Sequence, residues 1–465
     1  MCRTHVLLKV VVRGMHCSFA NKCFMYRHII CALVAGSMPV SNVFKTGIQV
    51  KQLAPAVALV SSSLVWFTLA SVAFGSSVDH LSWPFTVKLT VYGVYYATFA
   101  VSALLGASLF PRSRGTWLIS WMVFGVVMTA LLPLINGNSL VLDLFVSLLF
   151  GVSVGAGLPS SLAYFADTTV AENRGMSGGV IWGVVGFGVL GLALLTNGLD
   201  QLQTFLVLAI WRAAGLAVFL ALSRFRKNVQ PSANSSSYRF ILRRRDVTLY
   251  LLPWIMFCLV NFAESPILGK LFGEFQTFAG FIEFAISGVF AIVGGVLADI
   301  VGRKRVVITG FVVLGIEYAV LSLFSGSKAS WYVYTTFDGI AWGMFASVFF
   351  MTLWGDLAED GQKEKYYVLG GLPYPLAYFI PVIVKPFAEG IETATAFSLA
   401  SFFLFLAVLP LMYAPETLPE KKIKEMELKS YAEKAKKMKE KTLRTKMFVG
   451  RGEASVLSRD SDDEL

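Results

Sequence analysis

Long apolar runs separated by short polar segments are the dominant pattern along this chain of 465 residues. A helix needs roughly 20 apolar residues to cross the hydrocarbon of a bilayer at 1.5 Å per residue. Twelve runs have about that length, and their nearly continuous apolar character predicts membrane-spanning helices rather than half-exposed ones. The predicted spans are 55–76, 87–109, 115–135, 140–163, 176–197, 201–222, 248–270, 277–298, 306–324, 331–353, 369–390 and 392–413.

Several residues between the apolar runs recur 189 positions later. The pairs related in this way are Gly106 and Gly295, Arg114 and Arg303, Asp167 and Asp356, and Arg174 and Lys363. A shared offset between separate features indicates a duplicated unit of about six spans. We therefore predict an all-α membrane protein with twelve transmembrane helices in two pseudo-symmetric six-helix bundles.

Composition divides the chain into five segments. These are a cytosolic basic leader (1–54), a first bundle (55–222), a cytosolic linker (223–247), a second bundle (248–413) and a cytosolic charged tail (414–465). The leader has no acidic residue, and we expect residues 1 to about 40 to pack on nothing. Met38 is a candidate for the true start of the protein.

Positive charge predicts the orientation. Of the 40 Lys and Arg residues, 35 fall in segments that lie on one side when both termini are placed in the cytoplasm. The net charge of +11 is then explained by contact with a bilayer whose inner leaflet is anionic, and nucleic-acid binding is not needed. We expect a monomeric multi-pass protein of the cell membrane.

The sequence has few features that are typical of an enzyme. All four histidines precede residue 81, and four of the five cysteines lie in the first 31 residues at spacings that fit no usual zinc pattern. No nucleophile elbow, phosphate-binding loop or metal-ligand cluster is found. We predict no enzymatic activity, no metal and no cofactor.

The segment between spans 8 and 9 carries a specific motif. Gly295-x3-Asp299-x2-Gly302-Arg303-Lys304 resembles the signature loop of the Major Facilitator Superfamily (MFS), and the resemblance extends over residues 55–413. Twelve spans, a basic central loop and a degenerate copy of the motif between spans 2 and 3 agree with it. The resemblance implies the MFS fold and a transporter that works by alternating access.

The resemblance also implies a gate that closes the cytoplasmic side. Arg303 would pair with Asp356, Arg114 with Asp167, and Asp299 would accept hydrogen bonds at the N-terminus of span 11. The residues assigned to this gate are Gly106, Arg114, Asp167, Arg174, Gly295, Asp299, Gly302, Arg303 and Asp356.

Some residues indicate a subclass. The Asp167-x6-Arg174 pattern and Pro415-Glu416-Thr417 after the last span are similar to sugar-porter-like members, which favours a sugar or small organic solute. Phe110 stands where the first-half loop would have its acid. Span 5 is rich in glycine but lacks the proline of efflux-type members, which lowers the expectation of a drug exporter.

Charged residues inside the spans are costly and therefore candidates for function. Glu264, Glu283, Asp338 and Lys385 share a depth of about 10 Å below the outer ends of their spans. We favour Glu264 as a proton carrier because Asn261 lies on the same helical face, with Asp338 next and Lys385 as the partner cation. Arg212 and Glu317 are expected to have structural roles.

Aromatic residues in the spans are candidates for solute contact, although at helical spacing such residues more often serve packing. The proposed solute-binding residues are Trp66, Tyr92, Tyr95, Trp182, Asn261, Tyr374 and Tyr378. The leading prediction is a secondary active transporter that moves a small organic solute, coupled to protons. The alternatives are a non-transporting membrane sensor on the same fold, an uncoupled facilitator and a drug exporter.

Overall fold

The computed structural model describes residues 50–109, 114–223, 237–358 and 363–425, together with isolated positions between 427 and 439. Within these residues, twelve helical segments are long and apolar enough to cross a membrane. The predicted basic leader and the candidate start at Met38 lie outside the described residues, except for the leader's last few positions. Phe110 and the centre of the linker also lie outside them.

The first group of helices contains six of these segments. Its elements are α4 (Val50–His80), α5 (Phe85–Leu109), α6 (Arg114–Leu131), η2 (Leu132–Leu134), α7 (Leu140–Gly155), α8 (Leu158–Thr168), η3 (Ala171–Asn173), α9 (Arg174–Thr196) and α10 (Gln201–Leu222). Helix α10 packs along both α4 and α6, and α5 packs along α7.

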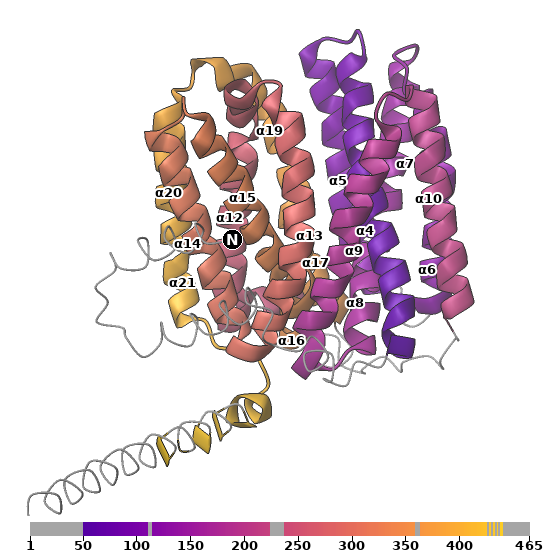
Figure 1. Ribbon diagram of the computed structural model, residues 1–465. Coiled ribbons are helices and arrows are strands. Elements are labelled where there is room, and N and C mark those ends of the chain that lie inside the picture. The colour runs from indigo at the N-terminus through magenta and orange to yellow at the C-terminus, as the bar shows by residue number, and fades with distance from the viewer. Residues whose placement is uncertain are drawn as a thin grey trace, which may run out of the picture. The chain divides into compact units, whose positions relative to one another are not determined.

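The second group contains the other six segments and begins after the short linker helix α11 (Tyr238–Arg243). Its elements are α12 (Arg245–Phe272), α13 (Phe275–Val301), α14 (Arg303–Leu323), α15 (Lys328–Phe345), the π-helix η4 (Ala346–Thr352), α16 (Leu353–Leu357), α17 (Lys363–Gly371), α18 (Pro373–Ala377), α19 (Ile380–Val384), η5 (Lys385–Gly390), α20 (Thr393–Leu406) and α21 (Val408–Tyr413). Figure 1 shows the two groups by colour. Helix α9 of the first group and α13 of the second lie side by side where the groups meet.

The eleventh span is broken into short helices and begins earlier than predicted. Prolines stand in the first turns of α18, α19 and η5, where a missing N–H and a fixed φ interrupt the helical hydrogen bonds. Its first helix starts at Lys363 rather than at residue 369. The first turn of this helix has the polar sequence Lys363-Glu-Lys365, so a search for apolar runs does not include it.

Helices α9 and α13 form the closest contact between the two groups. A Cβ atom added to Gly179 would lie 2.3 Å from the carbonyl oxygen of Ala291, and one added to Gly295 would lie 2.2 Å from that of Gly175. Gly186 meets α13 at Gly288 in the same way. Small residues thus let the two backbones touch, as is usual for helices that pack in lipid.

A buried cation lies inside the first group. Arg212 is fully buried, and its guanidinium lies 4.5 Å from the ring of Trp66 and 4.3 Å from that of Trp121. It also donates to the hydroxyl of Ser63. Both aromatic contacts are cation–π interactions, so Arg212 packs among α4, α6 and α10.

The linker helix α11 rests on the first group. The Tyr238 hydroxyl donates to the carbonyl oxygen of Leu104 at 2.7 Å and lies 3.0 Å from the Ser108 hydroxyl. Burial raises the pKa of Tyr238, so this hydroxyl stays protonated and remains a donor at neutral pH. The described end of the linker is therefore attached to α5.

Candidate functional site

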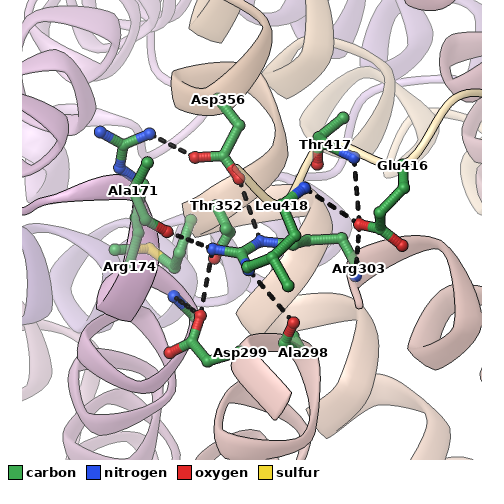
Figure 2. A network of polar contacts seen from close by, with 12 residues as sticks. Ala171, Arg174, Ala298, Asp299, Arg303, Thr352, Asp356, Glu416, Thr417 and Leu418 are labelled. Carbon is green, nitrogen blue, oxygen red and sulfur yellow. Dashed lines mark hydrogen bonds and ion pairs between the residues drawn. The ribbon is translucent and has the colours of Figure 1, made fainter. Parts of the chain in front are cut away.

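Asp356, at the end of α16, connects the two groups of helices. It accepts a hydrogen bond from Arg303 Nε at 3.0 Å, and its other oxygen pairs with Arg174 at the start of α9 (Figure 2). Arg303 is fully buried, and the Asp356 side chain is 1% exposed. Because Arg174 and Asp356 come from different groups, the pair ties α9 to α16.

Asp167 repeats this arrangement at the related position in the first group. It pairs with Arg114 of its own group and accepts a hydrogen bond from Lys363 of α17 at 2.6 Å. Arg114 pairs in addition with Glu364, through Nε at 2.8 Å. Each aspartate therefore holds one cation from its own group and one from the other, which confirms the predicted pairing of Arg303 with Asp356 and of Arg114 with Asp167.

Asp299 binds a helix N-terminus, but not the one predicted. Its two oxygens accept hydrogen bonds from the backbone N–H groups of Gly175 at 3.0 Å and Met176 at 2.7 Å, in the first turn of α9. The prediction that Asp299 caps span 11 is wrong, because α13 packs along α9 whereas span 11 contacts α5 and α8. The chemistry is the expected one, since free amides and the helix dipole favour an anion there.

The Pro-Glu-Thr sequence after the last span adds a second cap. Glu416 accepts hydrogen bonds from the backbone N–H groups of Arg303 at 2.8 Å and Lys304 at 3.3 Å, which open α14. Lys304 Nζ in turn donates to the carbonyl oxygens of Met412 and Ala414. Figure 2 shows Glu416 beside Arg303. From the sequence, the Pro415-Glu416-Thr417 motif was expected only as a family feature, and the structure adds its role as a helix cap.

We call this set of contacts the latch. It consists of Arg114, Asp167, Arg174, Asp299, Arg303, Asp356, Lys363 and Glu364. Gly106 and Gly295 of the predicted gate support it through packing, because a Cβ at Gly106 would lie 2.0 Å from the carbonyl oxygen of Ala156. Gly302 has a φ of 104°, where a side chain is strained.

Four carboxyl groups meet inside the second group of helices, and we call them the acid cluster. They are Glu264 of α12, Glu283 of α13, Glu317 of α14 and Asp338 of α15. Asp338 interacts electrostatically with each of the other three. One oxygen of Glu264, one of Asp338 and both of Glu317 are buried without a hydrogen-bond partner. The shared depth of Glu264, Glu283 and Asp338 below the outer ends of their spans predicted that these three acids lie near one another. It did not predict that Glu317 lies with them.

Lys385 lies away from the acid cluster and pairs with another residue. Its Nζ lies 3.2 Å from Asp79 Oδ2 at the far end of α4, and both side chains are exposed. The expectation that Lys385 neutralises one of the carboxyl groups is therefore wrong. Since Lys385 opens η5 near the end of span 11, its charge reaches the outer surface of the helices rather than their interior. In the described part of the chain, no salt bridge joins the acid cluster to a cation, and no group of acids, His or Cys could hold a metal ion.

Two of the predicted solute-binding aromatics are engaged within the first group. The Trp66 indole N–H donates to Thr129 Oγ1 at 2.7 Å, and the ring is fully buried against Arg212. The Tyr92 hydroxyl donates toward the carbonyl oxygen of Gly75 at 2.8 Å and lies 3.0 Å from Asp79. Their contacts are those of packed core residues.

The other predicted aromatics approach one another across the two groups. Trp182 of α9 stacks on Phe350 of η4, with ring centroids 4.9 Å apart, and Phe350 meets Tyr374 at 4.7 Å. The hydroxyls of Tyr374 and Tyr378 lie 2.8 Å apart. Tyr95 packs on Tyr96 of α5, with ring centroids 4.8 Å apart, and Tyr96 lies 5.3 Å from Phe379 of span 11. Asn261 is half-buried on α12.

Comparisons with known proteins bear on the fold. No family model matches the chain, and no curated protein matches its sequence. Among solved structures, the fucose:proton symporter of Escherichia coli is similar, with a TM-score of 0.59 and 13% sequence identity over 78% of this chain and 98% of that chain. At this identity the likeness concerns the fold, and the chain accordingly has the twelve-helix MFS fold predicted from its sequence.

Proposed function

We propose that the protein is a secondary transporter that moves a small organic solute across a membrane by alternating access. The observation that carries this proposal is the latch. Among the described residues, three ion pairs between the two groups lie at one end of the helices, and the remaining one is the exposed Lys385–Asp79 pair at the other. Buried ion pairs at one end and an exposed one at the other are what a structure closed on one side requires.

The latch can also open without unfolding either group. Its bonds between the groups join whole helices, and each aspartate keeps an arginine of its own group when they break. Because the arrangement of charges is duplicated, either group retains a compensated carboxylate after separation. The excess of Lys and Arg in the segments at the latch end supports a cytoplasmic position for the latch and for both termini, because positively charged loops remain in the cytoplasm.

Coupling to protons is the second part of the proposal. Burial and like charge both favour the uncharged form of a carboxyl group. Four acids without a cation can therefore hold and release protons as the site opens to either side. Glu264, Glu317 and Asp338 each have a buried oxygen with no partner. Glu264 and Asp338 are the proposed carriers among them, because Glu264 shares a helical face with Asn261 and Asp338 is the acid that interacts with all three others. The structural likeness to a fucose:proton symporter agrees with this proposal.

The test is transport by purified protein in liposomes, using a panel of small solutes with a pH-sensitive dye in the lumen. Glu264→Gln and Asp338→Asn should abolish proton-driven accumulation while solute exchange continues. Glu274→Gln, at an exposed position just before α13, is the matched control and should behave as the unaltered protein. Accumulation that persists in both variants would refute proton coupling. Absence of flux for every solute would favour a non-transporting sensor.

A further inference from the structure

The linker helix α11 has an inner face that rests on the protein and an outer face that is exposed. Ile241 is fully buried, and the Tyr238 hydroxyl donates to a backbone carbonyl oxygen of α5 at 2.7 Å. Residues three positions apart lie on the same side of a helix, so these two form the inner face. The outer face carries Arg239, Phe240 and Arg243, which are all exposed.

Contacts with both groups of helices hold α11 in place. On the side of α5, the Tyr238 hydroxyl also lies 3.0 Å from that of Ser108. On the side of α17, Lys365 Nζ lies 5.5 Å from the centre of the Tyr238 ring. Arg244, directly after α11, donates to the Tyr366 hydroxyl at 2.6 Å. Because α11 is attached on both sides, its outer face points in a fixed direction.

The position of α11 along the helices matches the boundary between acyl chains and lipid headgroups. Leu104, to which Tyr238 donates, lies in the second-last turn of span 2, which ends at Leu109. At 1.5 Å per residue, this contact is about 8 Å from the end of the span. Val101, Leu105 and Leu109 beside it are between 51% and 64% exposed and recur every four residues, as a lipid-facing stripe does. Interfacial helices lie at about this depth, with their apolar face roughly 5–10 Å into the boundary.

The exposed charge on and beside α11 is positive. Arg239, Arg243 and Arg245 are exposed, and none of the three takes part in an ion pair among the described residues. Arg244 differs from them, because it pairs with Asp246. Since Arg239 and Arg243 are four positions apart, they leave the same side of α11. Guanidinium groups presented in this way match the oxygens of a phosphate, which they bind through paired N–H groups.

Phe240 adds an apolar group to the same surface. Its side chain is 54% exposed, and Leu242 at the edge of the face is 43% exposed. A ring of this kind gains by insertion among acyl chains while the neighbouring arginines stay with the headgroups. An acidic protein would match the charges, but it would have to approach at a depth where lipid already surrounds the helices. The combination of arginine and phenylalanine at this depth therefore favours a phospholipid.

We propose that the outer face of α11, together with Arg245, is a binding site for anionic phospholipids. The three arginines hold the phosphate and headgroup, and Phe240 inserts beside the acyl chains. The site gives a definite location to the contact with an anionic leaflet that the net charge of +11 predicts. It does not rest on the proposed function, because lipid surrounds the helices whether or not the protein moves a solute.

Lipid binding to the purified full-length protein in detergent tests the proposal, with native mass spectrometry as the measurement. Phosphatidylglycerol and phosphatidylcholine with identical acyl chains are the probes. Phosphatidylglycerol should bind at least tenfold more tightly at its tightest site. Joint replacement of the three arginines (R239Q, R243Q and R245Q) should weaken that binding by about tenfold or more, because each cation near an anionic surface adds to the attraction.

Two further variants test the apolar part of the surface. Phe240→Ser should weaken the binding of both lipids, because it removes the group that inserts among the acyl chains. Phe240→Leu should keep most of the binding, since leucine is also apolar. Equal binding by Phe240→Ser and the unaltered protein would show that the ring does not contact lipid.

A matched control separates this surface from the effect of net charge. Joint replacement of three other exposed basic residues by glutamine removes the same charge outside α11 and should leave phosphatidylglycerol binding unchanged. These residues are Arg305, Lys421 and Lys424. Melting temperatures without added lipid show which variants are folded. If the triple arginine variant does not fold, amide exchange in the unaltered protein replaces it, and phosphatidylglycerol but not phosphatidylcholine should slow exchange in α11.

Several outcomes would overturn the site. Equal binding of the two lipids would show that the headgroup charge is not recognised, and equal losses in the two triple variants would show that net charge alone acts. Displacement of the lipid by an equal concentration of inorganic phosphate would identify the ligand as a free anion. Amide exchange in α11 that does not respond to phosphatidylglycerol would also contradict the proposal.

Discussion

Gly302 occupies a backbone conformation that its neighbours require. Its φ of 104° and ψ of 149° lie in a region that is essentially restricted to glycine. The turn lets α13 end and α14 begin within one residue, so that Asp299 and Arg303 both reach the latch. An added Cβ would also lie 2.3 Å from a carboxylate oxygen of Glu416.

Gly302→Ala should therefore destabilise the protein through both backbone strain and displacement of Glu416. The strain alone costs about 1–3 kcal/mol. We expect a lower melting temperature in detergent and loss of the cap at the start of α14. Gly371→Ala is a suitable control, because a Cβ there meets nothing within 4 Å and its φ is not positive. An unchanged melting temperature for Gly302→Ala would show that this turn tolerates a side chain.

The contact between α9 and α13 depends on glycine at particular positions along α9. Gly179 touches the backbone of α13, whereas a Cβ added to Gly191 of the same helix meets nothing within 4 Å. The two positions share a residue type and a helix but differ in what lies beside them. They provide a matched pair for testing whether backbone contact between the groups matters.

Gly179→Ala should separate α9 from α13, because a Cβ would lie 2.3 Å from the Ala291 carbonyl oxygen. Overpacking of this kind costs about 1–3 kcal/mol. We expect a lower melting temperature and impaired transport, whereas Gly191→Ala should be neutral or slightly stabilising because alanine favours helix more than glycine does. Similar behaviour of the two variants would indicate that the contact is not tight in the membrane.

The elements show how far the sequence alone could lead. Apolar run length located all twelve spans, and the shared offset of 189 residues identified Asp167 and Asp356 as equivalent before any geometry was known. The partner of Asp299 could not be obtained in this way, because it depends on which helix of the other group lies against α13. Lys385 was misplaced for a related reason. Depth along a span does not tell whether a long side chain turns inward or toward the surface.

At the scale of the whole molecule, the latch connects charge chemistry to conformational balance. Asp299 caps α9 from the other group through two hydrogen bonds that must break when the groups separate at this end. Its side chain is also paired with Arg303, at 3.0 Å between Oδ1 and Nη2. A carboxylate bound to amides contributes more than a neutral acceptor does, because its charge strengthens each bond.

Asp299→Asn should therefore favour the state in which the latch end is open. Hydrogen bonds to a charged group contribute about 1.5–3 kcal/mol, so the balance should shift by about tenfold or more. Peptides that cover the first turn of α9 should exchange their amide hydrogens faster, since Gly175 and Met176 lose their charged acceptor. Solute affinity should change little, because Asp299 lies apart from the acid cluster and the aromatic rings. Asp246→Asn, which removes a more exposed pair with Arg244 near the start of α12, should leave exchange in α9 unchanged. If Asp299→Asn leaves both amide exchange and transport as they are in the unaltered protein, this contact does not control opening.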